Sequence, residues 1–294
     1  MENFALFSDS ACDLSQELLD REHIRIIPYY VTFDKKQYVK ERAEISNAEF
    51  YRRLRSRQGF PSTSLPPVSD YEDAFRPALE KGQDVLCVCL TSKFSGSCQS
   101  AVDAAGSLRE EFPGRRVAVV DSILASGAQG LLLLEIARMR AAGLSFDAIL
   151  ANVEKIKNTG RAFVTVNTLE YLQRGGRIGL VSSLAGNILD IKPIIVLKDG
   201  ELNPVGRVRG RRAAVRRVIE LSFKYIESMG GDKDRFACCV LQSDCGPEAD
   251  VITETLIKAG IRPDIPVQEL GATIGSHIGA TVLGICLLRK YETM

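Results

Sequence analysis

The stretch VLCVCLTSKFSGSCQSA, residues Val85–Ala101, decides the fold class. It begins with an unbroken apolar run, Val85–Leu90, which is typical of a strand buried on both faces. A polar loop, Thr91–Gly96, comes next, and the small residues that follow it predict a helix. Strand, loop and helix in this order form the building unit of α/β folds.

Ser95 and Gly96 lie where this loop meets the helix. Ligands of α/β folds bind at such junctions, because the first helical turn presents unpaired N–H groups and the positive end of the helix dipole. One interpretation is therefore that the two residues hold an anionic head group. The other is that Ser-Gly is an ordinary helix start. The stretch alone leaves both open.

The composition argues against several classes of protein. At 294 residues the chain suits two medium domains better than one core. Lysine and arginine total 38 against 37 acidic residues, so the net charge of +1 gives no global field for nucleic acid or a membrane surface. Glu2 and the short apolar run after it argue against a signal peptide, and no run approaches the roughly 18 apolar residues of a membrane span. We expect a cytoplasmic protein without integral membrane association.

The eight cysteines and two histidines predict neither disulfides nor a metal site. No CxxC motif is present, and only His23 and His277 could add imidazole ligands. Cys87 and Cys89 are two residues apart, so they share one face of the predicted strand. Buried, reduced thiols are the expected state of these side chains in a cytoplasmic protein.

The first half of the chain alternates predicted strands and helices, which indicates a mostly parallel sheet with helices on both faces. The expected strands are Phe4–Phe7, Ile24–Phe33, Val85–Leu90 and Arg116–Val120. Besides the helix after Gly96, the expected helices are Leu14–Arg21, Ser46–Arg57, Ser69–Lys81, Ala125–Ala142 and Ser145–Lys157. Asp13 is expected to cap the first of these, and capping boxes begin those at Ser46 and Ser69. Pro77 should kink or split its helix, and Phe60–Val68 is a loop by composition.

The second half predicts another α/β domain with a mixed sheet. A hairpin through Asp199-Gly200 joins Ile194–Leu197 to Leu202–Val208. Further strands are expected at Arg161–Val166, Phe236–Leu241, Val267–Leu270 and Val282–Leu288. Helical segments are expected at Leu169–Leu172, Leu180–Leu189, Ala213–Glu227 and Glu248–Ala259, and Gly271–Gly279 is read as a glycine-rich loop. The predicted domains are residues 1–160 and 161–294.

Polar stretches rich in small residues mark the candidate site. They are Thr63-Ser64, Thr91–Ser97, Arg174–Arg177 and Gly271–Gly279. His277 in the last stretch is either a ligand-binding side chain or a structural histidine. Ser95 and His277 also allow a serine hydrolase, with Asp9, Asp121 or Asp244 as the third member, but KFSGS is not a G-x-S-x-G nucleophile motif.

Six arginines crowd into Arg207–Arg217, at positions 207, 209, 211, 212, 216 and 217. They form either a solvated surface or a binding surface. The run has no aromatic side chain that could stack on bases, which disfavours RNA and single-stranded DNA. A phosphate or an acidic protein partner fits better.

Several motifs, in their order and spacing, resemble the DegV family, the fatty-acid-binding subunits of the bacterial fatty-acid kinase system. They are SDSACDL, STSLPP, LTSKFSGSCQSA, VVDS, LEYLQRGGRIG, ILDIKPIIVLKDGEL and GATIGSHIG. The resemblance covers essentially the whole chain. It implies two α/β domains with a long-chain fatty acid between them, the tail in an apolar tunnel and the carboxylate at the domain junction. The residues matched to carboxylate binding are Thr63, Ser95, Gly96 and His277, with Ser64, Gly275 and Ser276 in support.

The resemblance also implies a role without catalysis. The family presents the carboxylate to a separate ATP-dependent kinase, which makes an acyl phosphate for phospholipid synthesis, and the bound fatty acid is the ligand in place of a cofactor. Arg207 and Arg209 match a region linked to engagement of the kinase. The chain departs from the family pattern at Leu65-Pro66-Pro67 and at Ala280-Thr281, which affects loop shape but removes no group expected to touch the carboxylate.

Overall fold

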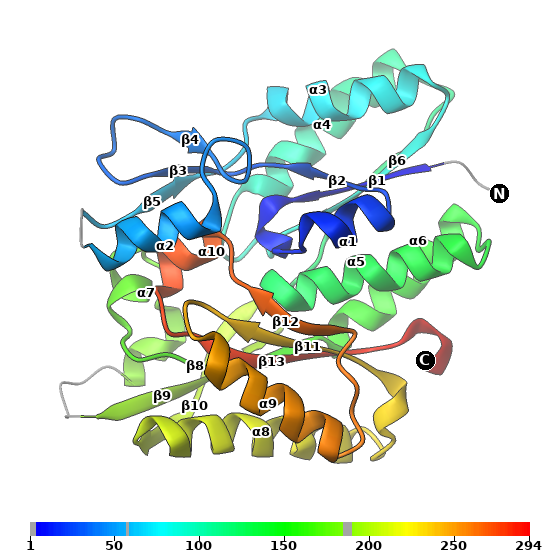
Figure 1. Ribbon diagram of the computed structural model, residues 1–294. Helices are drawn as coiled ribbons and strands as arrows, with labels where there is room; N and C mark the ends of the chain where they lie inside the picture. The colour runs from blue at the N-terminus through cyan, green and yellow to red at the C-terminus, as the bar shows by residue number, and fades with distance from the viewer. Residues whose placement is uncertain (1–3, 57–58, 185–189) are drawn as a thin grey trace.

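The computed structural model describes residues 4–56, 59–184 and 190–294, and two main sheets organise it (Figure 1). The first sheet has the order β2-β1-β6-β7, with every neighbouring pair parallel. Its strands are β1 (Phe4–Asp9), β2 (Ile24–Ile27), β6 (Asp84–Cys89) and β7 (Val117–Asp121). This arrangement confirms the parallel sheet expected for the first half.

Helices cover both faces of the first sheet, because successive side chains of its strands point to opposite sides. Phe7 and Cys87 face the core shared with α3 (Val68–Glu80) and α4 (Ser97–Glu111). Leu6 and Val88 face the opposite core, shared with α5 (Ser126–Ala141) and α6 (Phe146–Ile156). The short helix α1 (Gln16–Arg21) joins that second core through Leu19.

The second sheet has the order β10-β9-β8-β13-β11-β12. Its strands are β8 (Arg161–Thr165), β9 (Ile191–Lys198), β10 (Glu201–Arg209), β11 (Phe236–Gln242), β12 (Ile265–Glu269) and β13 (Leu283–Arg289). Only the β11–β12 pair is parallel, so the sheet is mixed, as predicted. One face packs against α8 (Arg211–Ser228) and α9 (Gly246–Lys258). A domain boundary at residue 160 would separate the strands of the two sheets and stays a prediction.

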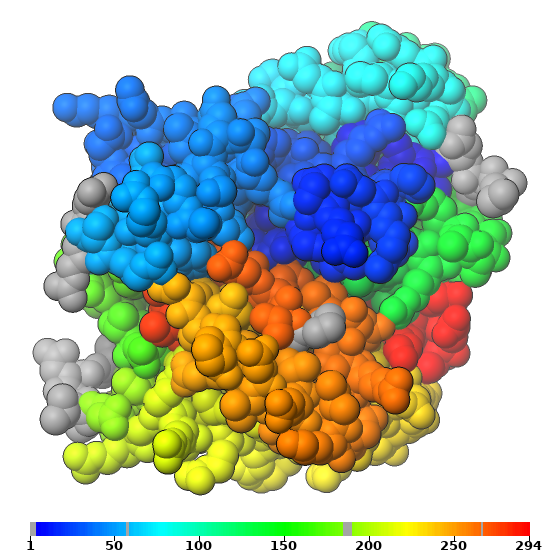
Figure 2. Space-filling view, viewed as in Figure 1, coloured from blue at the N-terminus to red at the C-terminus, as the bar shows by residue number. Residues whose placement is uncertain are grey.

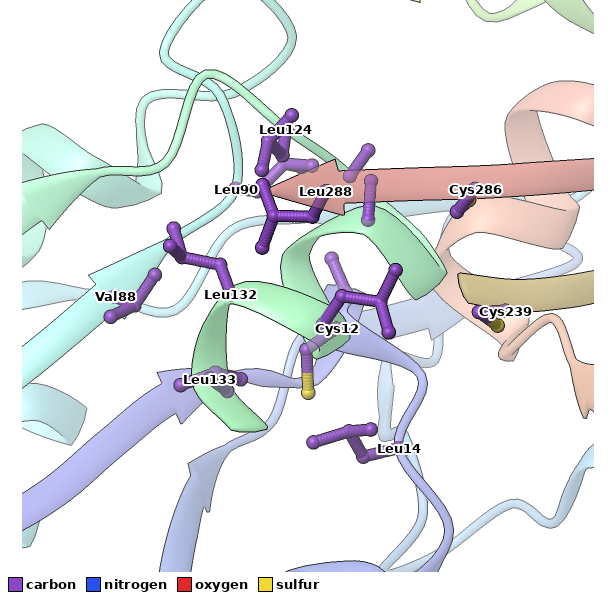
Figure 3. Close-up of a cluster of buried hydrophobic side chains, with 14 of the residues drawn as sticks. Cys12, Leu14, Val88, Leu90, Leu124, Leu132, Leu133, Cys239, Cys286 and Leu288 are labelled. Atoms are coloured by element: carbon purple, nitrogen blue, oxygen red, sulfur yellow. The ribbon is translucent and has the colours of Figure 1, made fainter. Parts of the chain in front are cut away.

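The central helix α5 lies between the two sheets and belongs to the core of both (Figure 3). Leu132 and Leu133 share one cluster with Cys12 and Val88 of the first half and with Leu288 of the second half. In the space-filling view, the blue segments of the first half meet the orange segments of the second half across the middle of the molecule (Figure 2). The two halves therefore share a buried apolar layer.

A third, small sheet of order β4-β3-β5 stands beside these layers. It contains β3 (Tyr30–Thr32), β4 (Val39–Lys40) and β5 (Ser62–Ser64), all antiparallel. Together with α2 (Asn47–Arg55), it receives the helix α10 (Ala272–Ile278) from the far end of the chain (Figure 1). The remaining helix is α7 (Glu170–Arg174), and short 3-10 turns are Ser10–Cys12, Lys157–Thr159, Gly179–Leu184, Lys233–Arg235 and Tyr291–Thr293.

Several local predictions in the first half are wrong. Ser15, and not Asp13, caps α1, because Asp13 is buried in a left-handed turn where it accepts a hydrogen bond from Ser126. The expected strand Ile24–Phe33 breaks around Pro28 into β2 and β3, which join different sheets. Helix α3 begins at Val68 without a side-chain cap, and it continues through Pro77 to Glu80 without splitting. The capping box at Ser46 is confirmed.

Two segments expected to be loops are regular structure. Ser62–Ser64 within Phe60–Val68 is strand β5, which pairs with β3. Most of the glycine-rich stretch Gly271–Gly279 is helix α10. Its glycines allow close packing, since a Cβ atom on Gly275 would lie 2.8 Å from the ring of Phe50. The predicted helix Leu180–Leu189 is a 3-10 turn up to Leu184, and its last five residues lie outside the described part.

Candidate ligand-binding site

A cavity of about 270 Å³ lies between the two halves of the chain. Most of its walls are apolar. They include Leu90 and Phe94 from the first half, and Ala162, Val164, Leu197 and Leu241 from the strands of the second sheet. Ala162 and Val164 are two residues apart on β8 and therefore share the face that packs toward α5. The cavity thus extends the buried apolar layer between the sheets.

The predicted ligand-binding residues in the lining come from three segments that are distant in sequence, and Tyr29, Ser126, Arg177 and Thr273 complete the polar lining. Thr63 and Ser64 end β5, Ser95 and Gly96 precede α4, and His277 lies on α10. Thr63 Oγ1 is 2.7 Å from His277 Nε2, although the residues are 214 positions apart. The side chain of Leu65 approaches Gly96 so closely that a Cβ atom there would be 3.3 Å from it. The fold therefore brings Thr63, Ser95, Gly96 and His277 to one cavity.

His277 is neutral near pH 7. Burial, and secondly the charge of Arg177, lower the pKa of its imidazole to about 4. Its Nδ1 atom is buried and has no hydrogen-bond partner among the described residues. Gly175 leaves room for the ring, since a Cβ atom there would be 2.4 Å from Nδ1. A neutral imidazole that donates from Nε2 to Thr63 would leave the threonine hydroxyl proton free for a ligand.

Ser95 and Gly96 lie at the start of α4, which begins at Ser97 without a side-chain cap. The Ser97 N–H donates to Ser95 Oγ at 3.2 Å, which fixes the serine side chain at the rim of the helix. Because no side chain caps the helix, other N–H groups of its first turn stay available to a ligand. This end of α4 also carries the positive end of the helix dipole.

Asp9, Tyr29 and Ser97 support the site through hydrogen bonds, and no local sequence pattern predicted this role. Tyr29 lines the cavity, and its hydroxyl lies 2.8 Å from Ser95 Oγ and 2.6 Å from Ser97 Oγ. Ser97 in turn donates to Asp9 Oδ2 at 3.2 Å. Asp9 entered the sequence analysis only as a third member for a hydrolase. Its place at the end of β1, beside the loop after β6, is the signal that could have revealed it.

Arg177 also lines the cavity and bridges the two halves. Its Nε and Nη2 donate to the carbonyl of Phe94 at 3.1 and 2.9 Å, and its Nη1 donates to the carbonyl of Gly175 at 2.7 Å. Each guanidinium nitrogen thus already has a backbone acceptor. Arg177 ends the candidate stretch Arg174–Arg177, and no function was predicted for its side chain.

The supporting residues are placed differently from one another. Ser64 is exposed and lines the cavity. Gly275 and Ser276 are buried outside the lining, where Gly275 packs against Phe50 and Tyr51 and Ser276 donates to the carbonyl of Ala272 at 2.7 Å.

The predicted docking arginines lie away from the cavity lining. Arg207 and Arg209 are exposed on β10, which is an edge strand of the second sheet. Neither forms an ion pair within the described ranges, whereas Arg211 pairs with Glu248 and Arg217 with Glu220. The charges of Arg207 and Arg209 therefore stay available at the surface.

The described residues contain neither a cluster of metal-ligating side chains nor a membrane-spanning helix. No group of three or more His, Cys, Asp or Glu side chains there is arranged to hold a metal ion. None of the helices described is both long enough and apolar enough to span a membrane.

Comparisons with known proteins give the same picture along the whole chain. The family described as "Uncharacterised protein, DegV family" matches residues 3–290. A DegV domain-containing protein of Caldanaerobacter subterraneus subsp. tengcongensis is 31% identical over 295 residues, which cover 99% of this chain and 100% of the relative.

Two solved structures share the fold closely. A stearic acid-binding protein from Eubacterium ventriosum has a TM-score of 0.94 and 33% identity, over 99% of this chain and 100% of its own. A DegV family protein from Thermus thermophilus, described as binding fatty acid, has a TM-score of 0.88 and 33% identity, over 98% and 99% of the two chains. The family matches residues 3–290, and the relative of 31% identity is matched along its full length. The chain therefore belongs to the DegV family.

Proposed function

We propose that this protein binds a long-chain fatty acid, with the acyl tail in the cavity and the carboxylate at Thr63, Ser95, Gly96 and His277. One observation carries the proposal: an apolar cavity between the halves is lined by neutral hydrogen-bonding groups next to the uncapped start of α4. The fatty acids described for the structures from Eubacterium ventriosum and Thermus thermophilus support the same ligand class.

The polar groups suit a carboxylate because a carboxylate only accepts hydrogen bonds. The hydroxyls of Thr63 and Ser95 and the Gly96 N–H are able to donate to it. The neutral imidazole of His277 uses its one N–H to donate to Thr63, which frees the threonine proton for the carboxylate. The helix dipole adds favourable electrostatics without a cation in direct contact. The guanidinium nitrogens of Arg177 are already bonded to carbonyl oxygens. Three of the five N–H groups of Arg177 are thus engaged with the backbone, and the neutral donors supply the remaining contacts of the carboxylate, which stays able to react as a nucleophile.

The tail supplies most of the affinity. At roughly 0.8 kcal/mol for each buried CH₂ group, fourteen methylenes contribute about 11 kcal/mol before costs. Ordering of the acyl chain and loss of its free motion offset part of this gain. Substitutions that narrow the apolar walls should therefore weaken binding more than loss of one hydroxyl.

We propose further that the protein is a carrier, without catalysis of its own, that presents the carboxylate to an ATP-dependent fatty-acid kinase. The kinase would join a carboxylate oxygen to the terminal phosphoryl group of ATP and release ADP, which yields an acyl phosphate for phospholipid synthesis. The exposed arginines Arg207 and Arg209 support an acidic docking partner. Reversal of both to glutamate should abolish kinase-dependent acyl phosphate formation while fatty-acid binding persists, and unchanged formation would contradict their role.

A serine hydrolase of acyl esters is the alternative, and the hydrogen bonds disfavour it. The imidazole Nε2 of His277 contacts Thr63, whereas the Ser95 hydroxyl contacts Tyr29. A hydrolase needs the histidine to take the proton of the serine and a carboxylate to orient the histidine. Within the described residues, no side chain contacts Nδ1 of His277.

Native mass spectrometry tests the proposed function directly. The purified protein should carry the added mass of one fatty acid, which is released on denaturation. An ester-hydrolysis assay on the same sample should show no turnover. A ligand-free protein that hydrolyses acyl esters, and loses that activity in Ser95→Ala, would establish the hydrolase instead.

A further inference from the structure

A continuous chain of hydroxyl contacts connects the cavity to the buried carboxyl of Asp9. Ser95 Oγ at the cavity is 2.8 Å from the Tyr29 hydroxyl, which is 2.6 Å from Ser97 Oγ. Ser97 Oγ is 3.2 Å from Asp9 Oδ2. Asp9 and Ser97 are 0% exposed and Tyr29 is 2% exposed, so water does not supply alternative partners inside the chain of contacts.

Only neutral groups surround Asp9. Its other hydrogen bonds come from the Leu90 N–H at 2.8 Å, from Gln129 Nε2 at 3.0 Å and from the Ala11 N–H. Among the described residues, no cation forms a hydrogen bond or ion pair with Asp9. The titratable groups that feel its charge include the phenols of Tyr29 and Tyr71 and the thiols of Cys12, Cys87, Cys89 and Cys98. The pKa of each is raised, for Cys89 and Cys98 first by a hydrogen bond to a neighbouring thiol and for the others by burial. No cation therefore compensates an ionised Asp9 at this point.

The protons of these contacts can be counted. Without a ligand there are three contacts, namely Ser95–Tyr29, Tyr29–Ser97 and Ser97–Asp9. The three hydroxyls carry three protons, and all three contacts are satisfied when each hydroxyl donates toward an ionised Asp9. In this state the Ser95 proton points away from the cavity.

A carboxylate at Ser95 adds a fourth contact that also needs a proton. If Asp9 stays ionised, one of the four contacts must place two acceptors against each other, which is costly in a buried network. If Asp9 carries a proton, the direction of donation reverses, from Asp9 through Ser97 and Tyr29 to Ser95 and on to the ligand. Oδ2 of Asp9 can still accept the Leu90 N–H in that state.

We propose that Asp9 supplies this fourth proton, so that binding of a carboxylate at Ser95 takes up one proton at Asp9 and turns the Ser95 hydroxyl toward the ligand. Asp9 is then a positioning residue, acting through Ser97 and Tyr29 without touching the ligand. The inference rests on the proposed function, because it requires a carboxylate at Ser95.

The state of Asp9 in the empty protein agrees with this role. Burial raises the pKa of Asp9 to about 6, so the group is mostly ionised above pH 7 yet gains a proton easily. Binding of the ligand requires a proton on Asp9, and ionisation of Asp9 at higher pH therefore opposes binding. The dissociation constant of a carboxylate should therefore rise as the pH rises above about 6, by up to tenfold for each pH unit.

Isothermal titration calorimetry with decanoate tests the inference, because the decanoate carboxyl is ionised above pH 6. Titrations in two buffers of different ionisation enthalpy measure the protons taken up on binding. At about pH 8 the wild-type protein should take up close to one proton for each decanoate bound, and its dissociation constant should rise with pH as described.

Tyr29→Phe is the decisive variant, because it removes both the tyrosine proton and the link between the two serines. Two contacts then remain, Ser97–Asp9 and Ser95–ligand, and the two serine protons satisfy both of them. Proton uptake should disappear, and the affinity for decanoate should become independent of pH. Tyr30→Phe is the matched control, because the Tyr30 hydroxyl donates to Asp70 at 2.7 Å and does not line the cavity, so it should keep the proton uptake of the wild type.

The possible outcomes separate the inference from the proposed function. Tight binding without proton uptake in the wild-type protein would overturn the inference and leave the function intact. Proton uptake that persists in Tyr29→Phe would also overturn it, because the proton would then reside on the ligand or on His277. Failure of wild-type protein freed of its ligand to bind decanoate or longer fatty acids at any pH would instead refute the proposed function.

Discussion

The helices α5 and α10 both lie where the two halves of the molecule meet, but different forces hold them. Helix α5 has sixteen residues and is buried along most of its length between the two main sheets. Most of its buried side chains are apolar, although Ser126 and Gln129 also donate hydrogen bonds to Asp13 and Asp9. Gly127 lets the helix approach the second sheet, since a Cβ atom there would lie 2.7 Å from Leu241. Apolar contacts of this kind are strong but not directional.

Helix α10 has only seven residues, and hydrogen bonds hold it to the first half. The N–H and the hydroxyl of Thr273 donate to Glu41 at 2.9 and 2.6 Å. Just before the helix, the Tyr51 hydroxyl donates to the Leu270 carbonyl at 3.0 Å. These bonds set the place of His277 at the cavity. Helix α5 thus holds the two halves together, and α10 sets the geometry of the site. Stability and ligand binding should therefore respond to different substitutions.

The largest expected effect is on α5. Leu132→Ala removes a side chain that is 0% exposed and should lower the free energy of unfolding by about 2–5 kcal/mol. Urea unfolding measures it, with Val102→Ala on α4 as the control, since Val102 is 41% exposed and its loss should change stability by less than about 0.5 kcal/mol. Equal effects of the two variants would show that α5 is not the apolar centre of the molecule.

A smaller loss of stability, but a larger loss of ligand affinity, is expected at Glu41, which holds α10 through Thr273. Glu41→Gln weakens the bonds from Thr273 to a side chain that is 1% exposed and should cost about 1–3 kcal/mol in unfolding free energy. It should also weaken decanoate binding, because α10 carries His277. Glu44→Gln, in the exposed turn nearby, is the control. If Leu132→Ala weakens decanoate binding by the folded protein more than Glu41→Gln does, then α10 does not control the geometry of the site more than α5 does.

Loss of one ligand donor should have a moderate effect on affinity alone. Ser95→Ala should raise the dissociation constant of a fatty acid about 5–30-fold, which corresponds to about 1–2 kcal/mol. Calorimetry measures it, with Ser92→Ala in the same loop as the control, since Ser92 does not line the cavity. An unchanged constant would remove Ser95 from the proposed carboxylate site.

The smallest expected effect is a change in pH dependence at His277. Its pKa is about 4 in the folded protein and 6.5 when unperturbed, so the unfolded chain binds more protons between these values. The stability contributed by the neutral imidazole is complete above about pH 6.5 and is lost as the pH falls toward 4. Asp9 acts in the opposite direction, because its pKa is raised from 3.8 to about 6.

The contribution of His277 is obtained from the unfolding free energies of wild type and His277→Gln measured at several pH values. The difference in unfolding free energy between wild type and His277→Gln should shrink as the pH is lowered from 6.5 to 4. His23→Gln removes the other histidine, which does not line the cavity, and serves as the control substitution. A constant difference for His277→Gln would mean that the imidazole is not buried in its neutral form.

Sequence patterns predicted the sheets well because their strands are buried on both faces. Val85–Leu90 and Val282–Leu288 are continuous apolar runs, and such runs depend little on tertiary context. The patterns failed where context decides the conformation. Ser62–Ser64 becomes a strand only because β3 offers a partner, and Gly275 of α10 reflects close packing against Phe50 and Tyr51 rather than a loop.

The candidate site was predictable only in part for a similar reason. Ser95, Thr63 and His277 stand in motifs that mark loop junctions or attract attention by composition. Tyr29 carries no such mark, and Ser97 ends the candidate stretch Thr91–Ser97 without a predicted role of its own. Their importance comes from contacts between residues that are 66 and 68 positions apart. A buried polar network of this kind is set by the fold and not by any local pattern.

The edge position of β10 also has a consequence for self-association. An open strand at the margin of a sheet exposes backbone groups that can pair with the edge of another molecule, and charged side chains are a common protection. Arg207 and Arg209 alternate along this strand and would repel a second copy of it. Their replacement by alanine therefore risks aggregation of the protein, whereas glutamate keeps the edge charged. Charge reversal is thus the cleaner way to examine these two arginines.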